Sequence, residues 1–180
     1  INSLIMKTKN ILIYCLIIIA ISFALYFNFD VKLSVSFACL GFLILSYSIY
    51  KEKIGQELII AFLMALIITS YYVYLYNLGN ILIGRINLFP LVAWTFGLVL
   101  LREIYERFRV KHKFLIIVSI YWFILLVLEY IGYYTFGIRL NWNYDSLFGL
   151  GIIHGPNFLK FFYLFAGPIY LLLTDYLKVK

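Results

Sequence analysis

Charged side chains are scarce in this sequence of 180 residues. Asp, Glu, Lys and Arg make up only 13% of it, while 65% of the residues are apolar and 21% are aromatic. A soluble domain is about a quarter charged and about half apolar. A core of this size has no room for the excess apolar residues, so a water-soluble protein is excluded. The same composition excludes an intrinsically disordered chain.

Cysteine and histidine are also rare, with two residues of each. Two cysteines are too few for a disulfide-stapled scaffold. The two histidines, His112 and His154, are separated by a long apolar run, so they cannot hold a haem as a pair or build a histidine-rich metal site. We therefore expect neither a metal site nor a cofactor.

Long apolar runs fill most of the chain. Because a helix needs about 20 apolar residues to cross the hydrocarbon of a bilayer, they predict an all-α integral membrane protein. We expect a bundle of six transmembrane helices in a single domain over residues 1–180. Dropping the fourth run, which contains Asn87 and Pro90, would leave five. The predicted spans are Ile11–Phe27, Leu33–Tyr50, Leu58–Leu78, Ile86–Leu101, Phe114–Phe136 and Pro156–Leu177.

The basic residues are distributed unevenly on the two sides of these spans. Eleven of the fifteen Lys and Arg residues fall on the side of both chain termini, and four fall on the other side. Short cytoplasmic loops carry an excess of positive charge, so this split favours six spans over five and predicts cytoplasmic termini in the cell (plasma) membrane. Anionic membrane lipids then account for the net charge of +7, and nucleic acid is not an expected partner. Met6 and the lysines after it are typical of a natural start, so residues 1–5 are expected to be a cloning remnant.

The predicted outer side is richer in polar residues. Asn77, Asn80 and Asn87 flank the connection between the third and fourth spans, and the connection Gly137–Gly155 joins the last two. Within that connection, Leu147–Ile153 is too short to span and too apolar for a wet loop. Two alternatives stay open: a short re-entrant segment that dips back into the membrane against protein, or a turn that lies flat at the headgroups.

Tyrosines gather at the predicted outer end of the third span. Tyr71, Tyr72, Tyr74 and Tyr76 follow one another closely there. Because Tyr and Trp are enriched at membrane interfaces in general, we expect these residues to form an interfacial aromatic belt rather than a ligand cage.

Glu129 is an acidic residue in the apolar part of the fifth predicted span. It lies about 22 Å along a helix that needs about 30 Å to cross, which places it in the outer third of the membrane. An ionisable side chain there is costly and marks a functional site by default. Trp122, Tyr133 and Phe136 share its helical face, and Tyr163 begins a matching face on the last span.

Two structural alternatives for Glu129 remain open at this point. The side chain could lock two helices together through hydrogen bonds to Asn, Tyr or backbone groups, or Arg85 or Arg139 could reach in and hold it ionised. Neither alternative requires a substrate.

One stretch of the sequence resembles a known family. The string Glu129-Tyr-Ile-Gly132-Tyr-Tyr-Thr-Phe136-Gly137, followed by Tyr144-Asp145 and Gly155-Pro156, is similar to the signature region of the membrane carotenoid hydratases, a family related to the membrane lycopene cyclases. The resemblance covers residues 129–156. It implies that Glu129 handles a proton during chemistry on a polyene.

These patterns predict a polar site in the outer leaflet. Glu129, Asp145 and His154 are the expected catalytic residues, which would act on a lipid or isoprenoid substrate by acid–base chemistry. The expected substrate-binding residues are Trp122, Tyr133, Phe136, Arg139, Lys160 and Tyr163.

The start of the last span is expected to bind an anion such as a lipid phosphate, because Pro156 opens a helix beside Lys160 and His154. Alternatively, Lys160 simply extends to the outer headgroups. Two other functions also stay open. One is a non-enzymatic subunit or scaffold whose partners are other membrane chains, and the other is a small proton- or cation-coupled transporter.

Overall fold

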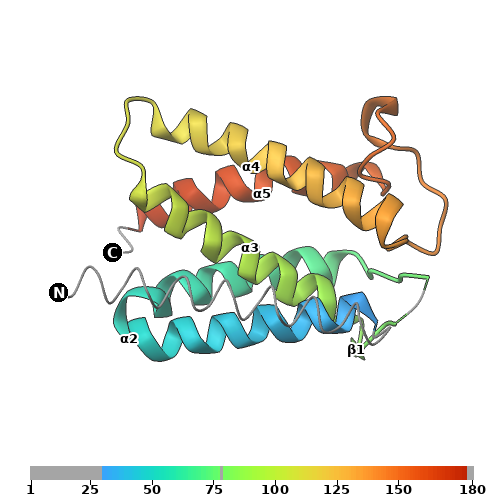
Figure 1. Cartoon of the computed structure of the whole chain (residues 1–180), viewed down its shortest axis with the longest axis horizontal. Coiled ribbons are helices and arrows are strands. Elements are labelled where there is room, and N and C mark those ends of the chain that lie inside the picture. Colours follow the sequence, from blue (N-terminus) through green and yellow to red (C-terminus); the bar gives the residue numbers. More distant parts are fainter. Residues whose placement is uncertain (1–29, 78, 178–180) are drawn as a thin grey trace.

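The computed structural model describes residues 30–77 and 79–177, without the side chains of residues 48–53. The first predicted span, Ile11–Phe27, and residues 1–5 lie outside this part of the chain. Within it, the fold consists of helices, a single two-stranded hairpin and their connections (Figure 1). The predicted all-α class is confirmed in this outline.

The helix α2 (Val31–Tyr71) folds back on itself, and Figure 1 shows its two arms running in opposite directions. Leu43 of the first arm and Ala61 of the second lie in one buried cluster, so the arms pack against each other. The second arm, Ile54–Tyr71, is long and apolar enough to cross a membrane, whereas the apolar helix Val31–Tyr47 is shorter.

Both ends of α2 follow from local chemistry. Asp30 caps the start, because its side chain accepts a hydrogen bond from the backbone N–H of Lys32 at 2.8 Å. The helix ends at Tyr71, since Tyr72 takes an extended conformation with φ −123° and ψ 120°. The predicted span Leu58–Leu78 is therefore wrong beyond Tyr71, and the chain leaves the helix earlier than its apolar composition indicated.

A small hairpin precedes the next helix. Strands β1 (Leu82–Ile83) and β2 (Ile86–Asn87) pair antiparallel, and Gly84 opens the turn between them with φ 63°, a conformation that glycine adopts without strain. Asn87 ends the hairpin and caps the following helix, because its side chain accepts a hydrogen bond from the backbone N–H of Phe89 at 3.2 Å.

The remaining helices fall on three of the predicted spans. The predicted span Ile86–Leu101 is wrong at both ends, since Ile86–Asn87 form β2 and the helix that follows continues to Arg107. Like Ile54–Tyr71, each of the remaining helices is long and apolar enough to cross a membrane. For α4 this length includes the π-helical turn η1 (Ile131–Thr135), which continues the helix. The last helix contains Pro168, as expected, and Pro156 caps its start. These helices are α3 (Leu88–Arg107), α4 (Lys113–Tyr130) and α5 (Asn157–Tyr176).

The segment between α4 and α5 is irregular. It contains a 3₁₀ turn, η2 (Leu147–Gly149), and leaves Phe148 and Leu150 exposed while Leu147 and Ile153 are buried. Its depth in a membrane stays a prediction.

The helices are arranged so that α3 crosses between the α2 arms and the α4–α5 pair (Figure 1). We call the end that carries residues 72–77, 79–87 and 136–156 the loop end, and the end that carries the α3–α4 connection the charged end. The larger of the buried apolar clusters extends to the loop end, where Tyr74, Tyr76, Trp94 and Leu159 pack together.

Candidate functional site

Glu129 lies near the loop end of α4 with its side chain turned toward α5. It is half-buried, and its carboxyl group lies close to the Tyr163 hydroxyl. The carboxyl group also lies close enough to Tyr74 and Tyr76 to act on both electrostatically. Among the described residues no Lys, Arg or His side chain pairs with it, so the predicted alternative of an ion pair with an arginine is wrong for this part of the chain.

The tyrosines that face Glu129 come from the extended chain after α2. Tyr74 and Tyr76 are only 1% and 8% exposed, so the prediction that they form an interfacial belt is wrong. Burial raises the pKa of Tyr74; a contact with Trp94 lowers it, and the charge of Glu129 raises it further. Both phenols therefore stay neutral, so they add no charge to the surroundings of Glu129.

Two asparagines hold this extended chain in place. The Asn87 amide donates a hydrogen bond to the backbone carbonyl of Tyr74 at 2.7 Å, and Asn80 exchanges hydrogen bonds with the backbone of Tyr76 at 2.7 and 2.9 Å. The same Asn87 amide also reaches Asn80 Oδ1 at 2.8 Å. Asn87 is 1% exposed, so these bonds satisfy backbone groups that water cannot reach.

Aromatic side chains also join α4 to α5. Tyr121 donates a hydrogen bond from its hydroxyl to the backbone carbonyl of Tyr163 at 2.7 Å, and the Trp122 indole N–H donates to the carbonyl of Leu164 at 2.8 Å. The ring of Trp94 on α3 packs edge-on against Tyr163, with ring centroids 5.2 Å apart. The aromatic neighbours of Glu129 thus come from α5 and the extended chain after α2, and Trp94 of α3 packs against one of them, Tyr163.

A second group of predicted site residues gathers around Tyr133, which lies on the π-helical turn about one turn beyond Glu129. The ring of Tyr133 stacks on His154, with centroids 4.0 Å apart and an interplanar angle of 16°, and the Arg139 guanidinium lies 4.6 Å from the Tyr133 centroid. Burial lowers the pKa of His154, and the positive charges of Arg139 and Lys160 lower it further. Tyr133, Arg139, His154 and Lys160 are therefore brought together, as the predicted anion site requires.

Asp145 and Phe136 are not part of either group. Asp145 is exposed, and in the described part of the chain no hydrogen bond or ion pair joins it to Glu129 or His154. Phe136 is 36% exposed at the end of the π-helical turn. Across residues 30–77 and 79–177, no three His, Cys, Asp or Glu side chains lie close enough together to hold a metal ion.

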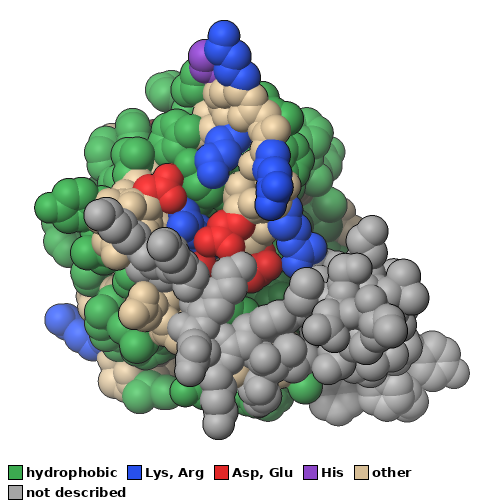
Figure 2. Space-filling view, turned by 90° about the vertical axis from the view of Figure 1, so that its left-hand side faces the viewer, with side chains coloured by type: hydrophobic (Ala, Val, Ile, Leu, Met, Phe, Trp, Pro, Cys, Tyr) green, Lys and Arg blue, Asp and Glu red, His purple; other side chains and the backbone are tan. Residues whose placement is uncertain are grey.

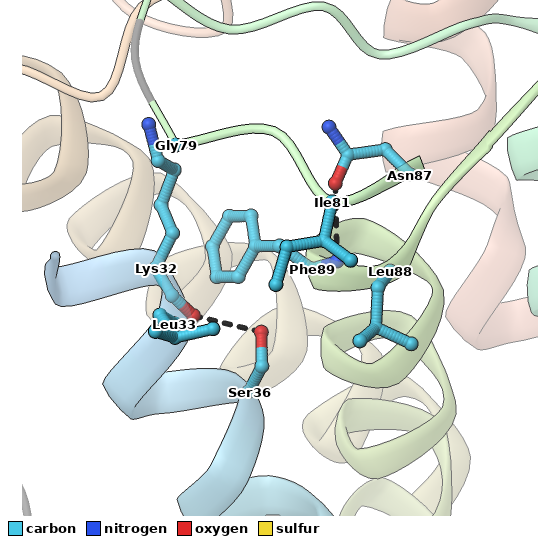
Figure 3. Close-up of a pocket in the computed structure, with 8 residues that line it drawn as sticks. All are labelled: Lys32, Leu33, Ser36, Gly79, Ile81, Asn87, Leu88 and Phe89. Atoms are coloured by element: carbon cyan, nitrogen blue, oxygen red, sulfur yellow. Dashed lines mark hydrogen bonds between the residues drawn. The ribbon is translucent and has the colours of Figure 1, made fainter. Parts of the chain in front are cut away.

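A small pocket lies elsewhere at the loop end, between the start of α2 and the start of α3 (Figure 3). The Ser36 hydroxyl donates to the carbonyl of Lys32 at 2.7 Å, and the Asn87 side chain is engaged as a cap and as a donor. None of the predicted site residues lines this pocket. It is lined by Lys32, Leu33, Ser36, Gly79, Ile81, Asn87, Leu88 and Phe89.

The charged end holds a buried ionic cluster that the sequence analysis missed. Arg102, only 5% exposed, lies between three carboxylates: its Nε is 3.7 Å from Glu57 and 3.3 Å from Glu106, and a terminal guanidinium nitrogen is 2.5 Å from Asp175. Figure 2 shows acidic and basic side chains side by side on this face. Arg102 is therefore buried among these carboxylates, and Glu106 lies one helical turn from it along α3.

The part of the chain that the structure describes holds four helices long and apolar enough to cross a membrane, which indicates a small polytopic membrane protein. No family model, curated protein or solved structure matches the chain. The function must therefore be argued from the two groups of side chains around Glu129 and Tyr133.

Proposed function

We propose that this protein is an integral membrane enzyme that acts by acid–base chemistry on an apolar lipid, with an isoprenoid or carotenoid-like polyene as the substrate class. Glu129 carries the proposal, because a carboxyl group in a membrane-spanning helix faces a tyrosine hydroxyl and has no cationic partner among the described residues. The resemblance of residues 129–156 to the carotenoid hydratases supports the same role.

The chemistry of a polyene suits this environment. Transfer of a proton from the Glu129 carboxyl group to a carbon–carbon double bond leaves a carbocation on the lipid and a carboxylate on the protein. The aromatic faces of Trp94, Tyr74 and Tyr163 offer cation–π stabilisation to that charge. Water then adds to the cation, or a neighbouring carbon loses a proton, and the carboxylate takes up the released proton.

The lipid can reach the site from the bilayer. Few residues of α4 are buried, and Trp122 on the same helix is 38% exposed. A chain dissolved in the membrane therefore meets the α4 face beside Glu129 without passing through water.

Lipid extraction and mass spectrometry test this function. We expect cells that make the protein to contain a changed polyene or other lipid, and cells that make Glu129→Gln to match cells without the protein while the variant remains folded. Glu103→Gln is a matched control, since Glu103 forms a surface pair with Arg107 at 3.2 Å, and it should keep the wild-type lipid profile.

Each of the other outcomes rejects part of the proposal. An active Glu129→Gln would make Glu129 a structural residue that holds α4 to α5. A wild-type protein that changes no lipid would overturn the enzymatic function.

We also propose the topology that the basic residues predict: six spans in the plasma membrane, with both termini and the charged end in the cytoplasm. The split of Lys and Arg supports it, because five of them fall between Arg102 and Lys113 at the charged end. A single cysteine placed at residue 112 should react with a membrane-impermeant maleimide only after the cells are opened. A cysteine at residue 143 should react in intact cells.

A second function, a subunit of a membrane complex, is favoured by the sparse packing of α4. Its buried residues are Ile117 and Val118, whereas Leu115, Phe123 and Leu128 are each more than 60% exposed. Such a face can pack against another membrane chain as well as against lipid. Native co-purification of one stoichiometric membrane chain, lost in a Phe123→Ala/Leu128→Ala variant, would support this function over the enzyme.

A further inference from the structure

Positive charge is concentrated beside Tyr133 without visible compensation. The Arg139 guanidinium and the His154 ring both contact the Tyr133 ring, and Lys160 is close enough to His154 to act on it electrostatically. In the described part of the chain no Asp or Glu forms an ion pair with Arg139 or Lys160. Like charges gathered in this way repel one another, and an anion bound among them would relieve that repulsion.

The hydrogen-bonding groups of the cluster are also incompletely used. The Nδ1 atom of His154 is buried and has no hydrogen-bond partner among the described residues. The Lys160 ammonium donates to Asn157 Oδ1 at 3.5 Å, the long limit for such a bond, so it can turn to a better acceptor. An oxyanion among these side chains would give a hydrogen-bond partner to His154 Nδ1 and a better acceptor to the Lys160 ammonium.

The first turn of α5 adds donors at the same place. Pro156 caps this helix without a side-chain hydrogen bond, and its 20 residues direct the positive end of their dipole toward the loop end. Lys160 sits in that first turn. The helix thus reinforces the cationic cluster.

The cluster is adjacent to Glu129 along the chain. Tyr133 follows Glu129 by about one helical turn, and the intervening backbone enters the π-helical turn η1. Such π-turns occur often at functional sites, since they shift the side chains that follow. Tyr133 therefore lies both in the cationic cluster and about one helical turn from Glu129.

We propose that the site takes an anionic amphiphile, a lipid whose phosphate binds Arg139, His154 and Lys160 while its apolar chain lies toward Glu129. This inference rests on the proposed function for the role of Glu129, and it adds the substrate class: an isoprenoid or other lipid that carries a terminal phosphate.

Binding to the purified full-length protein in phosphatidylcholine nanodiscs tests the inference. The probes are farnesyl monophosphate, its uncharged counterpart farnesol, and inorganic phosphate as competitor. We expect farnesyl monophosphate to bind at least tenfold more tightly than farnesol, and inorganic phosphate at equal concentration not to displace it. Displacement by inorganic phosphate would instead identify a site for free phosphate and overturn the amphiphile.

Three variants locate the binding. Arg139→Gln and Lys160→Gln should each weaken farnesyl monophosphate binding by about tenfold, the effect of one lost charge-assisted hydrogen bond, and leave farnesol binding unchanged. Arg85→Gln is the matched control, because Arg85 is exposed at the same end but lies outside the cluster, and it should bind as wild type. Unchanged farnesol binding also verifies that each variant is folded. Wild-type affinity in both cluster variants would overturn the inference.

Glu129→Gln separates this inference from the proposed function. The variant should still bind farnesyl monophosphate with wild-type affinity, since the cluster that holds the phosphate is intact. If binding follows these expectations but no lipid changes in cells, the enzymatic function fails and the phosphate site stands. If farnesol and farnesyl monophosphate bind equally while cells show lipid conversion, the phosphate site fails and the enzymatic function stands.

Discussion

Arg102 on α3 and Asp175 on α5 are joined by an ion pair whose guanidinium nitrogen and carboxylate oxygen lie 2.5 Å apart. The Tyr105 hydroxyl donates to the other oxygen of Asp175 at 2.9 Å, and Glu57 on α2 approaches the same guanidinium. One cation therefore connects three helices at the charged end, where Glu57 is fully buried. Because Arg102 and Glu57 are removed from water, the attraction between these two charges is screened little by salt.

Replacement of Arg102 by Met should destabilise the protein by about 3–5 kcal/mol, because it removes the buried guanidinium that the fully buried Glu57 carboxylate faces. The measurement is unfolding of the purified protein in a graded series of denaturing detergent. Arg107→Met is a matched control on the same helix, since its side chain is 57% exposed and pairs with Glu103, and it should change stability by less than about 1 kcal/mol. Equal effects of the two substitutions would contradict a buried cluster.

Gly167 provides the close approach of α5 to α4. A methyl group at this position would lie 2.8 Å from two ring carbons of Tyr121, and the ring is held in place by the bond from its hydroxyl to Tyr163. Gly167→Ala should therefore push the helices apart and destabilise the protein by about 1–3 kcal/mol. Thermal unfolding in detergent measures the change.

Gly97 offers the opposite case for the same substitution. It also lies inside a helix, but no atom comes within 4 Å of the position of its missing methyl group. Gly97→Ala should stabilise the protein by about 0.5–1 kcal/mol, as expected for removal of a helical glycine without a clash. If both substitutions shifted stability in the same direction, the contact between Gly167 and Tyr121 would not control helix packing.

Asn87 joins the extended tyrosine segment to the start of α3. Asn87→Ala should cost about 2–3 kcal/mol, because it removes the cap of α3 and leaves the buried carbonyl of Tyr74 without its donor. Asn87→Asp keeps the cap acceptor but not the donor, so it should recover only part of that loss. Chemical denaturation measures the stability of both variants. Asn143→Ala in the exposed loop is the control, and it should change stability by less than about 0.5 kcal/mol.

Helices were predictable where the sequence is apolar for a full membrane thickness. The π-extended α4 and α5 match the predicted spans Phe114–Phe136 and Pro156–Leu177 closely, since polar or glycine-containing segments bound each run. The third span was extended too far because hydropathy does not distinguish helix from extended chain. The alternation of tyrosines at positions 72, 74 and 76 was a signal for extended chain, and it outweighs the apolar composition there.

The candidate site was predictable only where its residues lie on helices, because helical spacing shows which side chains share a face. Helical spacing placed Glu129 and Tyr163 on facing stripes, and the structure brings the carboxyl group and the hydroxyl close together. Helical spacing accounts for Glu106, four residues from Arg102 on α3. Neither spacing nor composition could place Glu57 and Asp175 beside Arg102, because the packing of α2 and α5 against α3 decides which of these charges meet. Asp145 was predicted as a catalytic residue because of its place in the resembling stretch of sequence. In the structure it is exposed, and no hydrogen bond or ion pair in the described part of the chain joins it to Glu129.

Acidification should destabilise the loop end through His154. Burial lowers the pKa of His154, and the charges of Arg139 and Lys160 lower it further, so the folded protein takes up this proton at lower pH than the unfolded chain, where the pKa is about 6.5. The contribution to stability is therefore complete above about pH 6.5 and is lost as the pH falls below it. We expect the melting temperature of the wild type to drop more between pH 7.5 and pH 5 than that of His154→Gln, while His112→Gln at the charged end follows the wild type. Equal drops in the wild type and His154→Gln would show that His154 titrates alike in the folded and unfolded chains.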